Sequence, residues 1–548
     1  MTGAPALPEL HHHLPAPAQE GAVGTSDVVV YGATSGGVTA AVRAARDGRS
    51  VTLLAFDDHV GGMTSGGLGE TDVGRADAVG GLSRAFYADV ARHYGAPDPH
   101  WTVESHVAEL VYRRWLADAG VRVLHRRHIS GVTLHGRTLK EVRTDDGARH
   151  RAEVFVDATY EGDLMAAAGV PYTVGREASD VHGEPLAGVQ RSENHQFTRD
   201  VDPYLVPGRP GSGLLPGISA DPHGTAGEGD RRIQAYNFRL HVTSGPDRLP
   251  YPEPDGYDPA RYELLRRYVA AGGYELYGRT TPVRGDVHDM NNHGAFSSDH
   301  IGANHAWPEA VRIEPAASPG EQAAAAAAGH ALREQIFTDH VRYQAGLLHF
   351  LANDRRLPEP IRAATRRFGL APGEFTGTAH WPHQLYVREA RRMLGSYVIT
   401  QHNATGLPHP DDTVALASYV MDAHNAKRVL VDGRPCNEGN VQQPLARPFG
   451  IPYRAIVPPA GSCTNLLVAA AISASHVAYS SVRMEPVFMM LGEAAGAAAA
   501  LAAEADSSVQ DVDHETLRKA LSRTGAVLAW PPLTNGPQGA GSRRGGTV

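Results

Sequence analysis

The alternation of apolar and polar positions predicts a strand, a glycine-rich turn and a helix near the start of the chain. Residues 27–31 (DVVVY) form a short apolar run that suits a buried parallel strand. The turn at 32–37 (GATSGG) leads into residues 38–47, where small and apolar residues fit a helix packed on a sheet, with Gly48 as its C′ residue. Residues 50–54 (SVTLL) suit a second parallel strand. Together these segments predict one βαβ unit.

The pattern then changes from a helix to an antiparallel meander. Residues 104–119 have helical spacing, and residues 121–129 suit a strand. Residues 131–156 alternate in the way of a small meander that returns to the main sheet, and 157–163 (DATYEGD) would follow it as a loop. From about Tyr172 to Pro252 the chain is rich in Pro and Gly and lacks periodicity, which predicts a second lobe.

Helical signals return in the second half of the chain. Ser318 and Glu321 fit a capping box with Pro319 at the first helical position, which predicts a helix from 323 to about 352. The other predicted elements are a helix at 412–419, a strand at 423–431, and helices at 466–474 and 489–504.

Composition narrows the class of protein. With 548 residues the chain is long enough for two or more domains or lobes, and its formal charge of -9 argues against a general nucleic-acid binder. The two cysteines, Cys436 and Cys463, are too few for a disulfide framework, and we expect both to be reduced. No segment reaches the ~20 apolar residues of a membrane span, and residues 1–24 do not resemble a signal peptide. We therefore expect a cytoplasmic protein without membrane spans, in which His11–His13 belong to a mobile end.

The turn at 32–37 carries a dinucleotide fingerprint with one departure. A pyrophosphate is bound by N–H donors at a helix N-terminus, and glycines let the chain turn tightly beside it. Gly32 and Gly37 hold the first and third fingerprint positions, while Thr34 stands at the middle position. We predict that Ser35 and Gly36 complete this cofactor-binding turn.

The fingerprint also expects an acidic residue at the end of the second strand, where it binds the ribose hydroxyls. That position falls near Ala55, which has no such group. Asp57 or Asp58 could substitute through a longer loop, or these residues could be solvated turn acids. The sequence leaves both readings open.

A second glycine-rich segment, Gly61 to Gly69 (GGMTSGGLG), follows directly. Five glycines in nine residues carry an entropic cost that makes sense where the chain passes beside a bulky flat group. We therefore predict that Gly61, Gly62, Met63 and Thr64 line the cofactor.

Long blocks of unusual composition recur along the chain, among them YGATSGGVTAAVRAARDG at 31–48, HVGGMTSGGLGETDVG at 59–74, VDATYEGDLMAAAGV at 156–170 and SASHVAYSSVRMEPVFMMLGEAAGAAAA at 473–500. Through these blocks the chain resembles the FAD-dependent oxidoreductases with a glutathione-reductase-type Rossmann domain, in their large bacterial and fungal branch. The resemblance extends from residue 27 to about 504.

The resemblance implies an α/β fold, in which a Rossmann-type FAD-binding domain with a β-meander is joined to a discontinuous α+β substrate lobe. FAD would be held noncovalently by two distant segments, with Asp157 and Asp163 contributing to the first. In the second, Gly492 and Glu493 would open a helix whose N–H groups face the flavin, although an Ala-rich core helix is the alternative. The expected division is a disordered tail at 1–25, the FAD domain at 26–171 and 451–505, the substrate lobe at 172–450, and a C-terminal helix with a polar tail at 506–548.

Flavin oxidation of an alcohol or amine requires a base near the reacting carbon. Our candidates for the catalytic set are His476, His383, His424 and Arg483. Other polar clusters are Arg388, Arg391 and Arg392 on a predicted helix face, which would bind an anion or form surface ion pairs, and Asn291 to His293, which suit a hydroxylated substrate. His288, Asp289, His293 and His300 lack a known ligand spacing, so we predict no metal.

The leading hypothesis is oxidation of a CH–OH or CH–NH group of a small polar substrate, such as a sugar-like molecule or a natural product, with electrons passing to oxygen or another acceptor. A monooxygenase or a C=C reductase is an alternative. Its NAD(P)H would be external, because no second glycine fingerprint supplies a built-in NAD(P) domain. A binding protein in which the flavin is structural or absent is the third. The substrate and the oligomeric state stay open.

Overall fold

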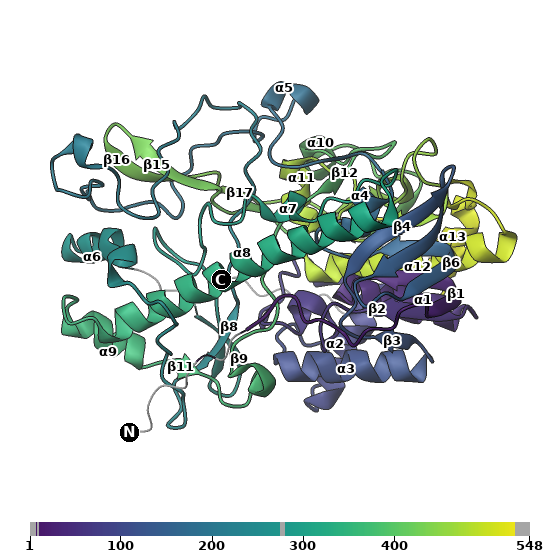
Figure 1. The fold of residues 1–548 in the computed structure, drawn as a ribbon, viewed down its shortest axis with the longest axis horizontal. Coiled ribbons are helices and arrows are strands. Elements are labelled where there is room, and N and C mark those ends of the chain that lie inside the picture. The colour runs from purple at the N-terminus through teal and green to yellow at the C-terminus, as the bar shows by residue number, and fades with distance from the viewer. Residues whose placement is uncertain (1–6, 8–9, 275–279, 532–548) are drawn as a thin grey trace, which may run out of the picture.

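The computed structural model describes residues 7, 10–274 and 280–531, and shows one elongated molecule with a sheet at one end (Figure 1). The strand order of this sheet is β3-β2-β1-β6-β5-β4, and β19 pairs in parallel with β6. The bounds are β1 Val23–Tyr31, β2 Val51–Leu54, β3 Arg122–Leu124, β4 Ile129–His135, β5 Thr138–Thr144, β6 Arg149–Asp157 and β19 Leu466–Val468.

The predicted βαβ unit and meander are confirmed. Tyr31 at the end of β1 pairs with Leu54 of β2 and with Asp157 of β6, so three parallel strands end at the same level. β4, β5 and β6 form the antiparallel meander, in which β6 returns to lie beside β1. Gly48 follows helix α1 (Ser35–Arg46) with a φ of 89°, as its predicted C′ role requires. The α/β fold with a Rossmann-type domain is therefore the observed one.

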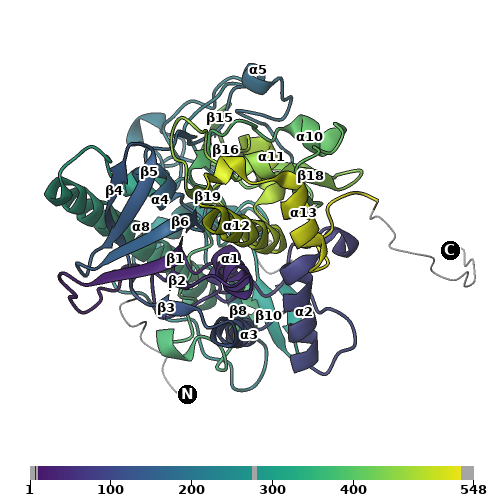
Figure 2. The same ribbon diagram turned by 90° about the vertical axis from the view of Figure 1, so that its right-hand side faces the viewer.

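Helix α12 (Glu485–Ala505) lies directly against α1 (Figure 2). Two glycines make this contact possible, because a Cβ on Gly492 would stand 2.0 Å from the backbone oxygen of Gly36, and one on Gly496 would stand 2.3 Å from that of Ala40. By length and composition α12 could cross a membrane, but 89% of its most apolar window is buried inside the protein. It is the core helix of this domain. The other helices here are α2 Gly81–His93, α3 Ser105–Asp118, α4 Asp163–Ala167 and α13 His514–Ser522.

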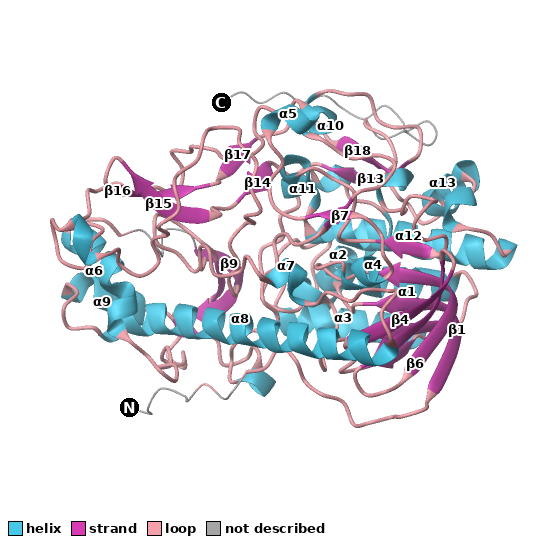
Figure 3. Ribbon diagram, turned by 45° about the horizontal axis from the view of Figure 1, so that its top comes forward, coloured by secondary structure: helices cyan, strands magenta, loops and turns pink. Residues whose placement is uncertain are grey.

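The rest of the molecule is a lobe of short strands and long loops at the other end (Figure 3). Helix α8 (Pro319–Asn353) spans the molecule, packing on β4 at one end and α9 at the other, and the predicted Ser318–Glu321 capping box is present. The sheet of this lobe runs β11-β8-β10-β9, with bounds β8 Leu240–Thr243, β9 Thr280–Arg284, β10 Val287–Met290 and β11 Gly369–Leu370.

Short two-stranded ribbons make up the other strand pairs of the described chain. They pair β7 Tyr172–Thr173 with β12 Arg392–Met393, β13 Thr413–Ala417 with β18 Phe449–Pro452, β14 Met421–Ala423 with β17 Val441–Gln443, and β15 Lys427–Val431 with β16 Arg434–Glu438. The remaining helices are α5 Ser179–His182, α6 Glu263–Ala270, α7 Trp307–Ala310, α9 Glu359–Arg366, α10 Gln401–Thr405 and α11 His476–Val482.

Two predicted helices are strands. Residues 466–474 supply β19 and a buried loop, and residues 412–419 supply β13. Both segments are fully buried apolar runs, whose periodicity does not separate a helix from a strand. Neighbouring strands decide the outcome, because β6 and β18 offer unpaired backbone groups at those places.

The N-terminal tail also differs from the expectation where it is described. Residues 10–14 pack against the folded domain, with the His12 ring 4.8 Å from the Trp307 ring, so they are not a free end. Most of the predicted polar C-terminal tail, from residue 532 onward, lies outside the described residues. Cys436 and Cys463 are free thiols, as predicted.

Candidate functional site

The turn after β1 is shaped by its two fingerprint glycines. Gly32 has a φ of 98°, and a Cβ there would stand 2.9 Å from the backbone nitrogen of Thr159. A Cβ on Gly37 would stand only 1.9 Å from the backbone oxygen of Gly32. The first glycine therefore permits the tight turn, and the third permits α1 to approach β1.

Thr34 at the middle fingerprint position is the N-cap of α1. Its Oγ1 accepts a hydrogen bond from the Gly37 N–H at 3.1 Å and donates one to the Ala158 carbonyl at 2.7 Å. The hydroxyl thus ties the helix start to the loop after β6, which explains why a threonine serves here. Next to it, the Oγ of Ser35 is buried, and it lowers the pKa of the Glu485 carboxyl beside it. The N–H groups at the start of a helix are suited to an anion.

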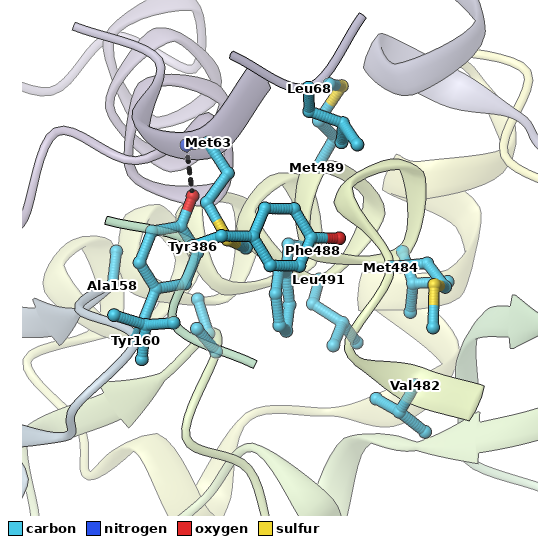
Figure 4. Packing of buried hydrophobic residues seen from close by; sticks show 14 of the residues in the cluster. Met63, Leu68, Ala158, Tyr160, Tyr386, Val482, Met484, Phe488, Met489 and Leu491 are labelled. Atoms are coloured by element: carbon cyan, nitrogen blue, oxygen red, sulfur yellow. Dashed lines mark hydrogen bonds between the residues drawn. The ribbon is translucent and has the colours of Figure 1, made fainter. Parts of the chain in front are cut away.

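The second glycine segment lies across this turn. The Gly61 N–H donates to the Ala33 carbonyl at 2.7 Å, and the Met63 N–H donates to the Tyr160 hydroxyl at 2.9 Å (Figure 4). Gly61 and Gly62 both have positive φ, at 108° and 57°. The segment therefore connects the loops at the ends of β1, β2 and β6.

A buried carboxylate, Glu485 at the start of α12, faces the same turn. It accepts hydrogen bonds from the Thr64 and Tyr160 hydroxyls. Burial raises its pKa despite these hydrogen bonds. Burial thus favours the protonated, neutral form of this carboxyl among residues that we predict to bind a cofactor.

Asp57 lines a cavity of about 30 Å³ at the carboxyl ends of β1, β2 and β6. Its Oδ1 accepts a hydrogen bond from the His59 N–H at 2.8 Å, and burial raises its pKa. Asp58 instead is exposed and pairs with Arg126. Of the two readings that the sequence left open, the structure favours Asp57 as a cavity-facing acid. The other lining residues are His12, Ala33, Thr34, Phe56, His59, Gly62, Tyr160, Glu161, His383 and Gln384.

We expect Asp57→Ala to weaken FAD binding by roughly 10–100-fold, since a hydrogen bond to a charged group is worth about 1.5–3 kcal/mol. Asp58→Ala is the matched control and should leave the affinity within about threefold, because Asp58 faces solvent. Titrating apoprotein with FAD and following the quenching of flavin fluorescence gives both dissociation constants. Equal affinities for the two variants would count against a role for Asp57.

Asp157 and Asp163 lie behind the cavity and are held by protein groups. The Asp157 carboxylate accepts hydrogen bonds from Thr159 and from the Met165 N–H, and burial raises its pKa to about 7. The Asp163 carboxylate pairs with Arg333 and Arg391. Both therefore shape the loop after β6, and neither lines the cavity.

The prediction that a helix opens at Gly492 is wrong, because α12 begins at Glu485. Gly492 lies in the middle of α12 against α1, as described above. The Glu493 carboxylate accepts a hydrogen bond from the Leu82 N–H and pairs with Arg43. The segment that faces the cofactor turn is instead the first turn of α12, where the carbonyl of Phe488 lies beside Gly36.

We call the turn at 32–37, the second glycine segment and Asp57 the cofactor cradle. A second, larger cavity of about 400 Å³ lies next to this cradle. Glu70 and Asp72, which follow the second glycine segment, line it. Tyr386 also lines it, and belongs to the same buried hydrophobic cluster as Met63 and Phe488 (Figure 4). The other lining residues are Asn194, His195, Arg239, Asn291, Asn292, Arg388, Tyr419, Val420, Asp422, His424, Gln442, Pro444 and Arg483. We call this cavity the polar pocket.

Three buried arginines give the polar pocket its character. The guanidinium groups of Arg239 and Arg388 lie 5.4 and 5.0 Å from the Tyr386 ring. The Nε atoms of Arg388 and Arg483 are buried without a hydrogen-bond partner in the described chain. Burial lowers the pKa of Arg388, and its neighbours Arg483 and Arg239 lower it further. A bound anion would offset this repulsion.

His424 forms a carboxylate–imidazole pair at the wall of the polar pocket. Its Nδ1 lies 2.8 Å from Asp299, and its Nε2 lies 3.4 Å from Asp422. Against the opposing effect of burial, Arg388 and His424 lower the pKa of Asp299. Asp299 therefore stays ionised and can hold the imidazole with a proton on Nδ1.

The four predicted catalytic residues fall in three places. His424 and Arg483 line the polar pocket, where Arg483 binds Asp422. His383 lines the small cavity instead and stacks on His59 at 3.8 Å. His476 starts α11, where its Nδ1 binds the Glu389 carboxylate at 2.8 Å and it lines neither cavity.

The prediction of a helix carrying Arg388, Arg391 and Arg392 is wrong. The segment is extended, so the three side chains point to different partners. Only Arg388 reaches the polar pocket. Arg391 pairs with Asp163, and Arg392 pairs with Glu177.

Two residues in or behind the polar pocket were not among our candidates. Arg239 lines the pocket, and Asp299 binds His424 behind its wall. Asn291 and Asn292 do line the pocket, as a polar substrate would require. The residues considered for a metal separate, since Asp289 pairs with Arg239 and His300 with Asp339.

The groups present suit the FAD that the resemblance implies. Thr34 to Gly37 offer a helix N-terminus, and Asp57, two residues beyond Ala55, lines the small cavity. Tyr386, from the same buried cluster as Met63, lines the polar pocket. The donor set therefore fits a bound dinucleotide.

Comparison with known proteins agrees with this geometry. The model of a family described as FAD dependent oxidoreductase matches residues 27–521. No curated protein matches the chain.

Similar solved structures include an L-amino acid deaminase from Proteus vulgaris, with 15% identity, 27% of this chain, 56% of that chain and a TM-score of 0.21. An L-proline dehydrogenase from P. horikoshii has 16% identity over 29% of this chain and 60% of that chain, with a TM-score of 0.23. A myxobacterial chondrochloren halogenase has 19% identity over 28% of this chain and 41% of that chain, with a TM-score of 0.23. The chain thus spans less than two thirds of each of these proteins, and we draw no conclusion about its reaction from them.

Proposed function

Since the chain belongs to the family of FAD-dependent oxidoreductases, we propose that it oxidises a CH–OH or CH–NH group of a small polar substrate in the polar pocket. The observation that carries the proposal is the Asp299–His424 pair at the pocket wall. Bound FAD would accept a hydride from the substrate carbon. Oxygen or another acceptor would then take the electrons.

His424 is the proposed base. With Nδ1 protonated toward Asp299, Nε2 is the ring nitrogen left to accept the proton of a substrate hydroxyl or amine, and the substrate would displace its 3.4 Å contact with Asp422. The carboxylates of Asp299 and Asp422 stabilise the imidazolium that results. His195 also lines the pocket, but burial lowers its pKa to about 4, so it holds a transferred proton less well.

The arginines favour a substrate with an anionic group. Arg388 and Arg483 each keep a buried Nε donor without a partner, which a carboxylate or phosphate would satisfy. Asn291 and Asn292 supply amide groups for further hydroxyls. A hydroxy acid, an amino acid or an acidic sugar meets these requirements.

The function is tested by anaerobic addition of such compounds to FAD-loaded protein. We expect the visible flavin absorption to bleach with at least one hydroxy or amino donor, and to return when oxygen or another acceptor is admitted. Stoichiometric bleaching by NAD(P)H alone would instead favour the monooxygenase or C=C reductase alternative. No bleaching by any donor would contradict the proposal.

We expect Arg388→Lys to raise KM for an anionic substrate about tenfold or more, with kcat changed less than threefold, because lysine keeps the charge beside Asp299 and loses the Nε donor. The neutral analogue of the same substrate should show no such change. Arg392→Lys removes an equally buried arginine outside the pocket and serves as the control. A KM that rises equally for the charged and the neutral compound would argue against recognition of an anion.

A further inference from the structure

The N-terminal segment reaches the cofactor cradle from outside the Rossmann unit. His12 lines the small cavity together with Thr34 and Asp57. Between this point and β1 the chain passes the turn that joins β5 to β6, where the Gln19 N–H donates to the Asp146 carbonyl at 2.6 Å. We call residues Leu10–Leu14 the strap.

One carboxylate accepts most of the hydrogen bonds of the strap, while the rings of His12 and His13 pack on neighbouring aromatic rings, His13 stacking on His330 at 5.2 Å. The N–H groups of His12 and His13 donate to the same oxygen of Glu334 on α8, at 2.9 and 2.8 Å. His11 lies 3.0 Å from the other oxygen of Glu334, and His13 lies 2.8 Å from Asp145. Within the described chain, residues 10–18 make no backbone-to-backbone hydrogen bond. The strap can therefore detach without breaking a sheet or a helix.

The small cavity behind the strap cannot hold the adenosine end of FAD as it stands. Its volume of about 30 Å³ holds roughly one water molecule, whereas the adenosine end of FAD needs many times more. Thr34, Asp57 and Tyr160 are fixed at the ends of β1, β2 and β6. His12 is not attached to the end of a strand. Among the lining groups, the strap is the one that can move at least cost.

We propose that the strap closes the adenosine end of the FAD site and opens to admit and release the cofactor. The His12 ring, 4.8 Å from the Trp307 ring, forms the outer wall of the small cavity. Glu334 holds the strap closed through its hydrogen bonds. The inference rests on the cofactor and on the cradle, and it holds whatever the substrate is.

The rates of FAD binding and release test the proposal. Stopped-flow flavin fluorescence would be recorded with full-length apoprotein, with Glu334→Gln, with His12→Ala, and with a chain lacking residues 1–16. Glu314→Gln, which changes an exposed carboxylate next to α8, is the control. We expect the association and dissociation rate constants both to rise at least about tenfold on deletion, and several-fold in Glu334→Gln, because two hydrogen bonds to a charge are weakened.

The ratio of the two rate constants separates a gate from a fixed wall. A gate speeds both steps and leaves the dissociation constant within about threefold, since closing opposes entry and exit alike. Unchanged rate constants in all three variants would overturn the proposal. So would faster release with unchanged association, because the strap would then be a permanent contact. If the deleted chain fails to fold, Glu334→Gln and His12→Ala decide the matter.

Discussion

Replacing His424 with alanine is expected to lower kcat by about 10²–10⁴-fold while FAD stays bound, because the variant has no group at the pocket wall to accept the substrate proton. Asp299→Asn should lower kcat by a smaller factor, since the amide can no longer stabilise the imidazolium. The rate of anaerobic flavin bleaching in a single turnover measures the reductive step directly, and the flavin spectrum reports cofactor content.

His195→Ala is the matched comparison, since His195 lines the same pocket without a carboxylate partner at hydrogen-bond distance among the described residues. We expect its kcat to fall less than about threefold, with a change mainly in KM. The pH profile adds a second readout, because the acid limb of kcat, where a base is lost by protonation, should no longer depend on an imidazole in His424→Ala. A larger loss of kcat in His195→Ala than in His424→Ala would reverse the assignment of the base.

The second large effect is expected from the glycines that bring α1, β1 and α12 together. Gly37→Ala places a methyl group 1.9 Å from the backbone oxygen of Gly32, and Gly492→Ala places one 2.0 Å from that of Gly36. Neither oxygen can move without shifting a strand end or a helix. Each variant should lose about 1–3 kcal/mol or more of unfolding free energy and retain little FAD, because the cofactor turn lies at both contacts.

Gly320→Ala is the control for both variants, because a Cβ at Gly320 meets no atom within 4 Å and alanine favours the helix there. Urea unfolding followed by circular dichroism gives the change in free energy, and the ratio of flavin to protein absorption gives the cofactor content. A Gly37→Ala protein with normal stability and a full complement of FAD would show that α1 does not need its close approach to β1.

Much of the cofactor domain could be predicted from local sequence. The strand at 27–31, the glycine turn, α1 and the C′ glycine are encoded by short-range rules of burial, turning and capping, and these elements appear as expected. The capping box at Ser318 fixed the start of α8 in the same way. The resemblance added FAD, which the family match bears out. That two distant segments hold the cofactor together stays a prediction.

The polar pocket depended on contacts that no local pattern contains. Asp299 and His424 are separated by 125 residues and meet only because the loops of the second lobe fold over one another. The single predicted cluster of arginines divides among three partners, because the segment is extended rather than helical. Periodicity could not reveal this, since a helix and a strand bury the same residue types.

The sequence by itself therefore determined the dinucleotide turn and its glycines, because a positive φ or a close backbone approach restricts the residue at that position wherever the rest of the chain lies. Only the tertiary structure decided the course of β19, the residues of the polar pocket and the seat of His12 against the cradle. Each of these depends on which buried partner is available, and that is a property of the packed chain rather than of its neighbours in sequence.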